Sequence, residues 1–230
     1  MYRYETHLHT WPVSKCGKAT VRETLEAYKA LGFAGVCITN HFINGNINIE
    51  SNRSYEERIR FYFSDYEEAC RIGQEIGLQV FGGVEMGHFG SDFLVYGLGK
   101  EWYLAHPEIE EMGETNMTGL LTLLMEQGAL VIHAHPFRER NYIDHIRLYP
   151  RHVHGVEVYN ACNVALANDM ALYYANGYGL RHFAGTDNHS AGNRQLFAGM
   201  ESDTPLESEQ GFIQKFLSGQ LRPFQFTNEP

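Results

Sequence analysis

The sequence predicts an α/β protein built on a parallel sheet. About seven short apolar segments have the composition of buried strands, and helical segments separate most of them along the chain. Several helical segments stop at a glycine, as at Gly32, Gly77 and Gly128. This alternation is typical of parallel strands joined by right-handed connections, and it fits both a closed barrel and an open doubly wound sheet. The glycine-rich motifs of nucleotide-binding open sheets are absent.

The individual elements follow in order. The first helix shows its periodicity plainly, because Val21, Leu25 and Tyr28 fall on one face. The expected helices are residues 20–31, 55–76, 118–127, 142–149, 164–176 and 207–217. The expected strands are residues 3–7, 35–39, 78–84, 93–96, 129–133, 156–159 and 180–184. Residues 44–54 have loop composition, and the acidic residues 100–114 are expected to form an irregular surface excursion.

Composition limits the classes of protein that the chain can represent. The 230 residues, 43% of them hydrophobic, predict a single domain over residues 1–230 with a sizeable core. No segment has the roughly 18 consecutive apolar residues of a membrane helix. The N-terminus lacks the apolar run of a secretory signal, so we expect a cytoplasmic protein without a membrane partner. The oligomeric state stays open.

Charge limits the partners that the chain can bind, and cysteine content indicates the redox state of its thiols. The formal net charge of −10 argues against binding along a nucleic-acid backbone. It is compatible with a small phosphorylated substrate if metal ions supply the positive charge. The four cysteines form no C-x-x-C pair and are expected to be reduced thiols.

Histidines and carboxylates gather where the expected strands end. The carboxyl ends of barrel strands converge on one face, so side chains far apart in sequence are predicted to share one pocket. In each His-x-His pair, alternation along a strand places both imidazoles on the same side. These ligand types suit Zn, Mn or Fe, and their number predicts two or three ions, with Glu85 or Asp187 bridging. The candidates are His7, His9, His41, Glu85, His133, His135, Asp187 and His189, with Glu157 nearby in the sixth strand.

As an ordered set, these residues resemble the PHP (polymerase and histidinol phosphatase) superfamily. The resemblance runs from His7 to His189 and rests on the first His-x-His, Thr39-Asn40-His41, a Gly-x-Glu, a His-Pro and a late Gly-x-Asp-x-His. It implies a distorted, TIM-like (β/α)7 barrel with a trinuclear metal centre that hydrolyses phosphoesters. It also implies a division of ligands. His7, His9, Glu85 and Asp187 would hold the first ion, Glu85 and His135 the second, and His41 and His189 the third.

The chain departs from the family pattern at three points. Asn40 replaces the aspartate of Thr-Asp-His and is uncharged. Cys16 stands where the family has an acidic or imidazole ligand of the third ion. A thiolate binds zinc well, although a small apolar role for Cys16 is equally open. No second histidine for the second ion follows the fourth strand. Asp92 lies at the start of that strand, the wrong end, so either the second ion is loosely held or His133 compensates.

Two arginines are candidates for binding phosphate. Arg138 closely follows His135, and its guanidinium can bind two phosphoryl oxygens at once. Pro136 restricts the chain, so Phe137 can pack back on the barrel and leave Arg138 facing the pocket. Arg194 is the second candidate. His9 and His189 are candidates to protonate the leaving group, although metal ligation competes with that role.

Two rival functions remain. An amidohydrolase-like C–N hydrolase on a related barrel also uses an early His-x-His and a late Asp. It usually needs a bridging lysine in mid-chain, and no lysine lies at an expected strand end. A non-catalytic metal-binding module is the other rival. The preferred reading is a phosphomonoesterase acting on a small metabolite, with histidinol phosphate or a nucleotide among the possible substrates.

Overall fold

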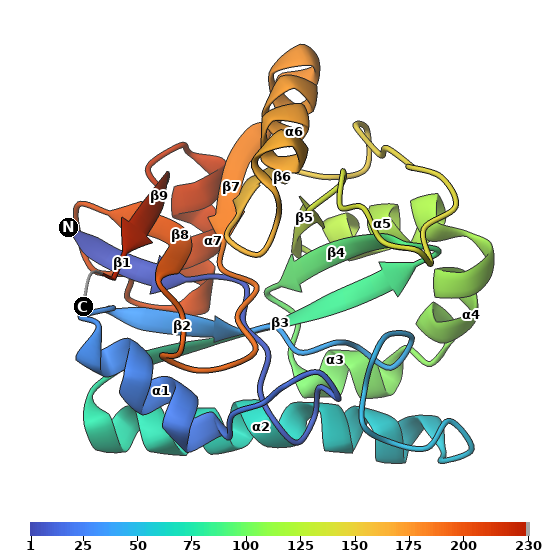
Figure 1. Cartoon of the computed structure of the whole chain (residues 1–230). Helices are drawn as coiled ribbons and strands as arrows, with labels where there is room; N and C mark the ends of the chain where they lie inside the picture. Colours follow the sequence, from blue (N-terminus) through green and yellow to red (C-terminus); the bar gives the residue numbers. More distant parts are fainter. Residues whose placement is uncertain (229–230) are drawn as a thin grey trace.

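The computed structural model describes residues 1–228, so the last two residues of the predicted domain lie outside it. Its strands are β1 (Tyr2–Glu5), β2 (Gly35–Ile38), β3 (Gln79–His88), β4 (Ser91–Tyr96), β5 (Leu130–Ala134), β6 (Gly155–Asn160), β7 (Arg181–Gly185), β8 (Leu196–Ser202) and β9 (Arg222–Thr227). They form one nine-stranded sheet in the order β7-β6-β5-β4-β3-β2-β1-β8-β9 (Figure 1).

Strands β1 to β7 form the ring of a nearly closed barrel. Just beyond β1 and β7, Leu8 and Asn188 form a parallel bridge. The His9 N–H donates to the Asn188 carbonyl at 2.9 Å, and the Asp187 N–H donates to the His7 carbonyl at 2.8 Å. The ring therefore closes at the carboxyl ends of its strands, whereas antiparallel β8 pairs with β1 at the other end. The α/β class and the TIM-like barrel are confirmed, with the hairpin β8-β9 added to the ring.

The helices are α1 (Val21–Ala30), α2 (Tyr55–Ile76), α3 (Lys100–Ala105), α4 (Glu108–Thr115), α5 (Met117–Glu126), α6 (Ala165–Tyr178) and α7 (Glu209–Leu217). Capping boxes begin the first two helices, with Thr20 pairing with Glu23 and Ser54 with Glu57. Helix α2 ends at Gly77, whose φ of 69° suits glycine. Figure 1 shows α1 and α2 along one side of the barrel and α6 standing out beside β6.

Three expectations from the sequence were wrong. Residues 100–114 contain α3 and most of α4, because Ile109 and Gly113 give α4 a buried face among its glutamates. Residues 142–149 form no helix, and Tyr142 and Ile146 stay exposed there, so no packed apolar face stabilises one. The sheet is mixed, since β4 runs antiparallel between β3 and β5.

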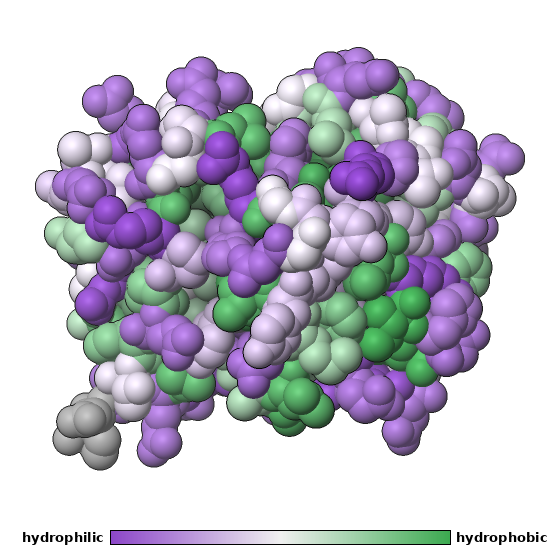
Figure 2. Space-filling model, turned by 90° about the horizontal axis from the view of Figure 1, so that it is seen from above, coloured by the Kyte–Doolittle hydropathy of each residue, from purple (hydrophilic) through white to green (hydrophobic). Residues whose placement is uncertain are grey.

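Apolar residues fill the barrel up to the edge of the polar centre. Inside it, Tyr96, Ile132 and Phe183 pack against Phe212 and Phe216 of α7, which closes the amino-terminal end. Outside it, a second apolar cluster lies between the sheet and helices α2 to α5. Seen from above, the surface mixes hydrophobic and hydrophilic residues (Figure 2). Among residues 1–228, no helix combines the length and apolar character that crossing a membrane requires.

Candidate metal centre

Imidazoles and carboxylates from the predicted strand ends converge at the carboxyl end of the barrel. Glu85, which is 1% exposed, lies at the middle. Its Oε1 lies 3.1 Å from His7 Nε2 and 3.0 Å from His135 Nε2. Its Oε2 lies 2.6 Å from His41 Nδ1 and 3.4 Å from His9 Nε2. One carboxylate thus faces four imidazoles, as expected of a bridging ligand.

Asp187 lies on the other side of the first His-x-His pair. Its Oδ1 is 3.2 Å from His9 Nε2 and 3.6 Å from His7 Nε2. The backbone φ of Asp187 is 58° and that of His135 is 26°, a region that residues with a side chain seldom occupy. Such strain is found at functional sites, and here it turns both side chains from the strand direction into the centre.

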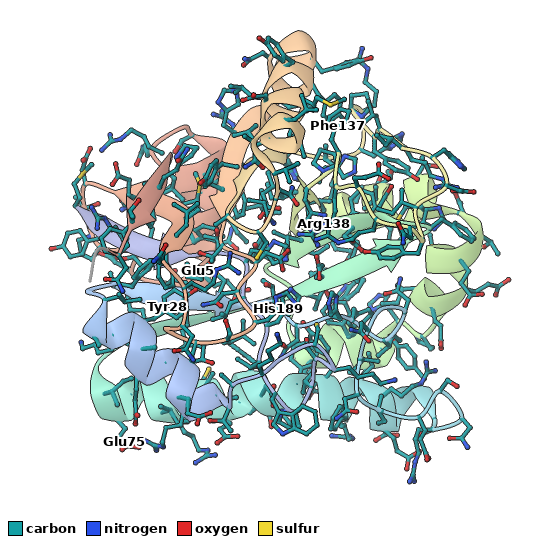
Figure 3. The ribbon with its side chains drawn as sticks, viewed as in Figure 1. Glu5, Tyr28, Glu75, Phe137, Arg138 and His189 are labelled. Atoms are coloured by element: carbon teal, nitrogen blue, oxygen red, sulfur yellow. The ribbon has the colours of Figure 1, made fainter. Side chains whose placement is uncertain are left out.

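A buried carboxylate beneath the centre ties its two main segments together. Glu5 Oε1 accepts hydrogen bonds from the backbone N–H groups of Thr6, His7 and Thr186, at 2.9, 2.9 and 3.0 Å. Its Oε2 accepts one from the Tyr28 hydroxyl at 2.6 Å (Figure 3). The chain before His7 and the chain before Asp187 therefore share one anchor.

Hydrogen bonds to Nδ1 orient two of the imidazoles. Glu157 Oε1 lies 2.9 Å from His7 Nδ1, and the Asp187 carbonyl lies 2.8 Å from His189 Nδ1. In each ring this leaves Nε2 free to act as a ligand, which is the usual arrangement around protein-bound metals. The sequence placed Glu157 in a strand without giving it a role. A carboxylate within an otherwise apolar strand was its only signal.

His9 is oriented by a hydroxyl instead of a carboxylate. Ser14 Oγ lies 3.3 Å from His9 Nδ1 and donates to Asn40 Oδ1 at 2.8 Å. Because its proton goes to Asn40, the hydroxyl accepts from His9 Nδ1, which leaves Nε2 unprotonated. The Asn40 amide is fixed in turn by Asp65 on α2, whose Oδ2 accepts from Asn40 Nδ2 at 3.1 Å.

The residues present fit a group of divalent metal ions. Four overlapping sets of residues each bring their ligand atoms within 4.8 Å of one another. These are His7, His9 and Glu85; His7, His135 and Asp187; Glu85, Asp92 and His135; and His9, Cys16, His41 and His189. Within residues 1–228, His9 Nε2 and Glu85 Oε2 are buried without a hydrogen bond of acceptable geometry. Buried polar atoms of this kind are costly unless a ligand satisfies them.

The pKa values of two anionic candidates, Glu85 and Cys16, agree with metal ligation. Burial raises the pKa of Glu85, but His41, His7 and His9 outweigh it and hold that pKa well below its usual range. Burial also raises the pKa of the Cys16 thiol, but hydrogen bonds with His189 and His41 lower it to about 6. Both groups are therefore ionised near neutral pH, as metal ligands must be.

Asp92 joins the centre, contrary to the expectation that it lies at the wrong end of its strand. Strand β4 is antiparallel to both neighbours, so its first residues lie at the carboxyl ends of β3 and β5. Asp92 Oδ2 is 3.9 Å from His135 Nδ1, and the two belong to one potential ligand set with Glu85.

His133 lies apart from the other candidates. Its ring stacks on Phe93 at 5.0 Å and meets the edges of Tyr149 and Tyr174, in the aromatic layer outside the barrel. Burial lowers its pKa to about 3. The expected pairing with His135 fails because β5 ends at Ala134 and the positive φ of His135 breaks the alternation.

Of the two arginines, one faces the pocket. Arg138 pairs with Asp187 through Nη2 and donates from Nε to Asn163 Oδ1 at 3.2 Å. It lines a cavity of about 610 Å³ together with Cys16 and His189. Arg138 and His189 are labelled in Figure 3. Phe137 packs back against Tyr174, as predicted from the turn after Pro136. Arg194 instead donates to Cys162 Sγ at 2.9 Å and to a backbone carbonyl.

The sequence matches no family model and no curated protein. Solved structures, however, share the fold. One is a two-domain protein from Bacteroides vulgatus that contains a predicted PHP-like metal-dependent phosphoesterase, with 14% identity and a TM-score of 0.68 over 98% of this chain. The chain spans 65% of the length of that protein.

Two further structures have the same fold. A protein from Bifidobacterium adolescentis, named as a proposed metal-dependent phosphoesterase, matches at 14% identity and a TM-score of 0.56, over 84% of this chain and 89% of its own. An amidohydrolase from Chromobacterium violaceum, with bound sulfate and no metal, matches at 15% identity and a TM-score of 0.55, over 96% and 97%. The chain therefore shares its fold with PHP-like phosphoesterases and with an amidohydrolase, which agrees with the fold that the resemblance implied.

Proposed function

We propose that this protein is a metal-dependent phosphoesterase that hydrolyses a small phosphorylated metabolite. The observation that carries the proposal is the set of overlapping ligand groups around Glu85, with Arg138 beside them in the same pocket. The structural neighbours named as metal-dependent phosphoesterases support the same activity.

Two or three divalent ions (Zn, Mn or Fe) would be held by these overlapping ligand sets. When bound, such ions make water nucleophilic near neutral pH and stabilise charge on phosphoryl oxygens. The protein's own residues do the rest. Glu85 and Asp187 hold the charge that fixes the ions, and Arg138 binds two oxygens of the phosphate and orients it for attack.

His189 is the better placed of the two candidates to protonate the leaving group. Its side chain is 25% exposed and lines the cavity, whereas that of His9 is fully buried. The cavity, about 610 Å³, suits a metabolite and is too small for a folded nucleic acid. Histidinol phosphate or a nucleotide would fit a pocket of this size.

An amidohydrolase-like C–N hydrolase is the second candidate, favoured by the neighbour of that name. Against it, no lysine is among the described residues that line the cavity. A metal-binding module without activity is the third.

One experiment separates these functions. The purified protein should contain two or three ions per chain by elemental analysis after growth in metal-replete medium. After removal and return of Mn²⁺, Zn²⁺ or Fe²⁺, it should release phosphate from members of a panel of phosphorylated metabolites. Trace metal alone would contradict the centre. Ammonia release from amides without phosphate release would favour the second candidate, and bound metal without turnover the third.

A further inference from the structure

The loop that carries Cys16 is fixed on both sides of the cysteine. The Lys15 N–H donates to the Asn46 carbonyl at 3.0 Å, and the Lys18 N–H donates to the His189 carbonyl at 2.7 Å. These bonds tie the loop to the segments that carry His41 and His189. Gly17 lets the loop fold back, since a Cβ there would lie 2.7 Å from the carbonyl carbon of Thr10. The thiol is thus held in place by the backbone.

The ligand sets of the centre differ in chemistry. The set that contains Cys16 has three imidazoles and a thiolate, and no carboxylate. The set that contains Asp92 has two carboxylates and one imidazole. Thiolate with imidazole is a tetrahedral zinc environment, whereas carboxylate-rich sites suit manganese and magnesium. One centre therefore offers a soft position and a hard position.

Two further observations point to a ligand at the soft position. His9 Nε2 is buried and has no hydrogen-bond partner within the described part of the chain. A second thiol, Cys162, lines the same cavity but is already engaged, because its Sγ donates to the Asp187 carbonyl at 3.0 Å and accepts from Arg194. The two cysteines of the pocket thus differ, and only Cys16 belongs to a potential ligand set.

We infer that Cys16 forms a thiolate site selective for zinc together with His9, His41 and His189, so that the centre holds zinc there and a harder ion beside Asp92. On binding, the thiol releases its proton and its sulfur bonds to the metal. This inference rests on the proposed function only in that both use the same centre.

The test is cobalt substitution. Metal-free protein titrated with Co²⁺ should develop a sulfur-to-cobalt charge-transfer band in the near ultraviolet that saturates at one Co²⁺ per chain. Zn²⁺ should remove the band, and Mn²⁺ at equal concentration should not. Cys16→Ser should lose the band. Cys162→Ser, the matched control in the same cavity, should keep it.

A second variant guards against simple misfolding. Cys16→Asp replaces a soft ligand by a hard one, so the aspartate should still bind a metal ion at this position. The preference of the site for Zn²⁺ over Mn²⁺ should fall by at least about tenfold, the lower end of the change in metal affinity seen when the hydrogen-bond partners of metal ligands are altered. Absence of the band in the wild type, or its loss in Cys162→Ser with retention in Cys16→Ser, would overturn the inference. Metal-dependent phosphate release without the band would leave the proposed function standing alone.

Discussion

Two groups of buried carboxylates in this barrel have opposite surroundings. Glu5 and Asp65 lie behind the centre, and their partners are backbone N–H groups, hydroxyls and an amide. Glu85 and Asp187 lie in the centre among imidazoles and, for Asp187, a guanidinium. Burial raises the pKa of the first pair. Burial also raises the pKa of Glu85 and Asp187, but neighbouring positive charges outweigh it, above all His41 for Glu85 and His7 for Asp187. Both pKa values therefore lie well below their usual range.

This difference shows that Glu5 and Asp65 support the fold, whereas Glu85 and Asp187 belong to the candidate metal centre. A carboxylate surrounded by the chain's own neutral donors is satisfied and holds segments together. A carboxylate that faces several imidazoles, with one oxygen left unsatisfied, is arranged for a cation that the chain does not itself supply. The two groups should therefore respond differently when each is removed.

The largest effect is expected in the centre. Glu85→Gln and Asp187→Ala should each lower kcat on a phosphomonoester by on the order of 10³-fold or more, because the ions contribute several kcal/mol to transition-state stabilisation. Metal content should fall while circular dichroism stays that of the wild type. Near wild-type turnover in both variants would mean that the centre is not the site of reaction.

Removing the supporting carboxylate should act on folding first. Glu5→Ala leaves three buried N–H groups without an acceptor, so the free energy of unfolding of the metal-free protein should fall by at least about 3 kcal/mol. Tyr28→Phe removes a single hydrogen bond from the same carboxylate and should cost about 1 kcal/mol. Urea denaturation measures both. Equal stability of Glu5→Ala and the wild type would remove the distinction between the two groups.

Arg138 contacts a carboxylate of the centre and also faces the cavity, since it pairs with Asp187 and lines the pocket. Arg138→Ala should lower kcat/KM by about 2–4 kcal/mol in transition-state terms, by analogy with loss of one oxyanion donor. Part of the loss should appear in KM, because phosphate is also held in the ground state. Arg138→Lys keeps the charge and should lose less. Metal content should not change in either variant. An unaltered kcat/KM would mean that a group other than Arg138 binds the phosphate.

The sequence predicted the residues of the metal centre better than the buried carboxylates, Glu5 and Asp65, that lie behind it. Ligands at the carboxyl ends of parallel strands follow from the barrel itself, so His7, Glu85 and Asp187 could be placed without coordinates. Glu5 and Asp65 lie within a strand and a helix, where no motif marks them. The role of Glu5 depends on a closure between residues about 180 positions apart, as in the hydrogen bond from the Thr186 N–H to Glu5.

Asp92 could have been predicted. The expected strands 78–84 and 93–96 are separated by too few residues for a crossover helix, and parallel strands need a connection of roughly a dozen residues or more. The pair must therefore be antiparallel, which moves the start of the second strand to the side of the centre. The turn at Phe89 and Gly90, both with positive φ, joins the two strands as a tight hairpin.

A smaller effect is expected at Ser14, which orients the candidate metal ligand His9. Ser14→Ala removes the acceptor of His9 Nδ1, so the ring loses its preferred tautomer and metal binding should weaken by about 10–100-fold, as for other residues that orient ligands. In metal-free protein, the ring ¹⁵N shifts of His9 should move from one protonated and one bare nitrogen toward a mixture. Ser64→Ala, on the exposed side of α2, is the matched control. Unchanged shifts in Ser14→Ala would show that another group fixes the ring.

The smallest effect is expected at His133, where the same comparison applies to imidazoles. His133 and His135 are two positions apart, yet one lies among aromatic rings and the other contacts Glu85. Both ring nitrogens of His133 are buried without partners among the described residues, so an apolar side chain should suit the position as well. His133→Leu should therefore keep its metal and turnover and change the free energy of unfolding by less than about 1 kcal/mol in either direction. His135→Leu, the matched variant, should lose metal from the set that contains Asp92. If both variants lose metal to the same extent, His133 is also a ligand, and the segment after β5 must rearrange when the ions bind.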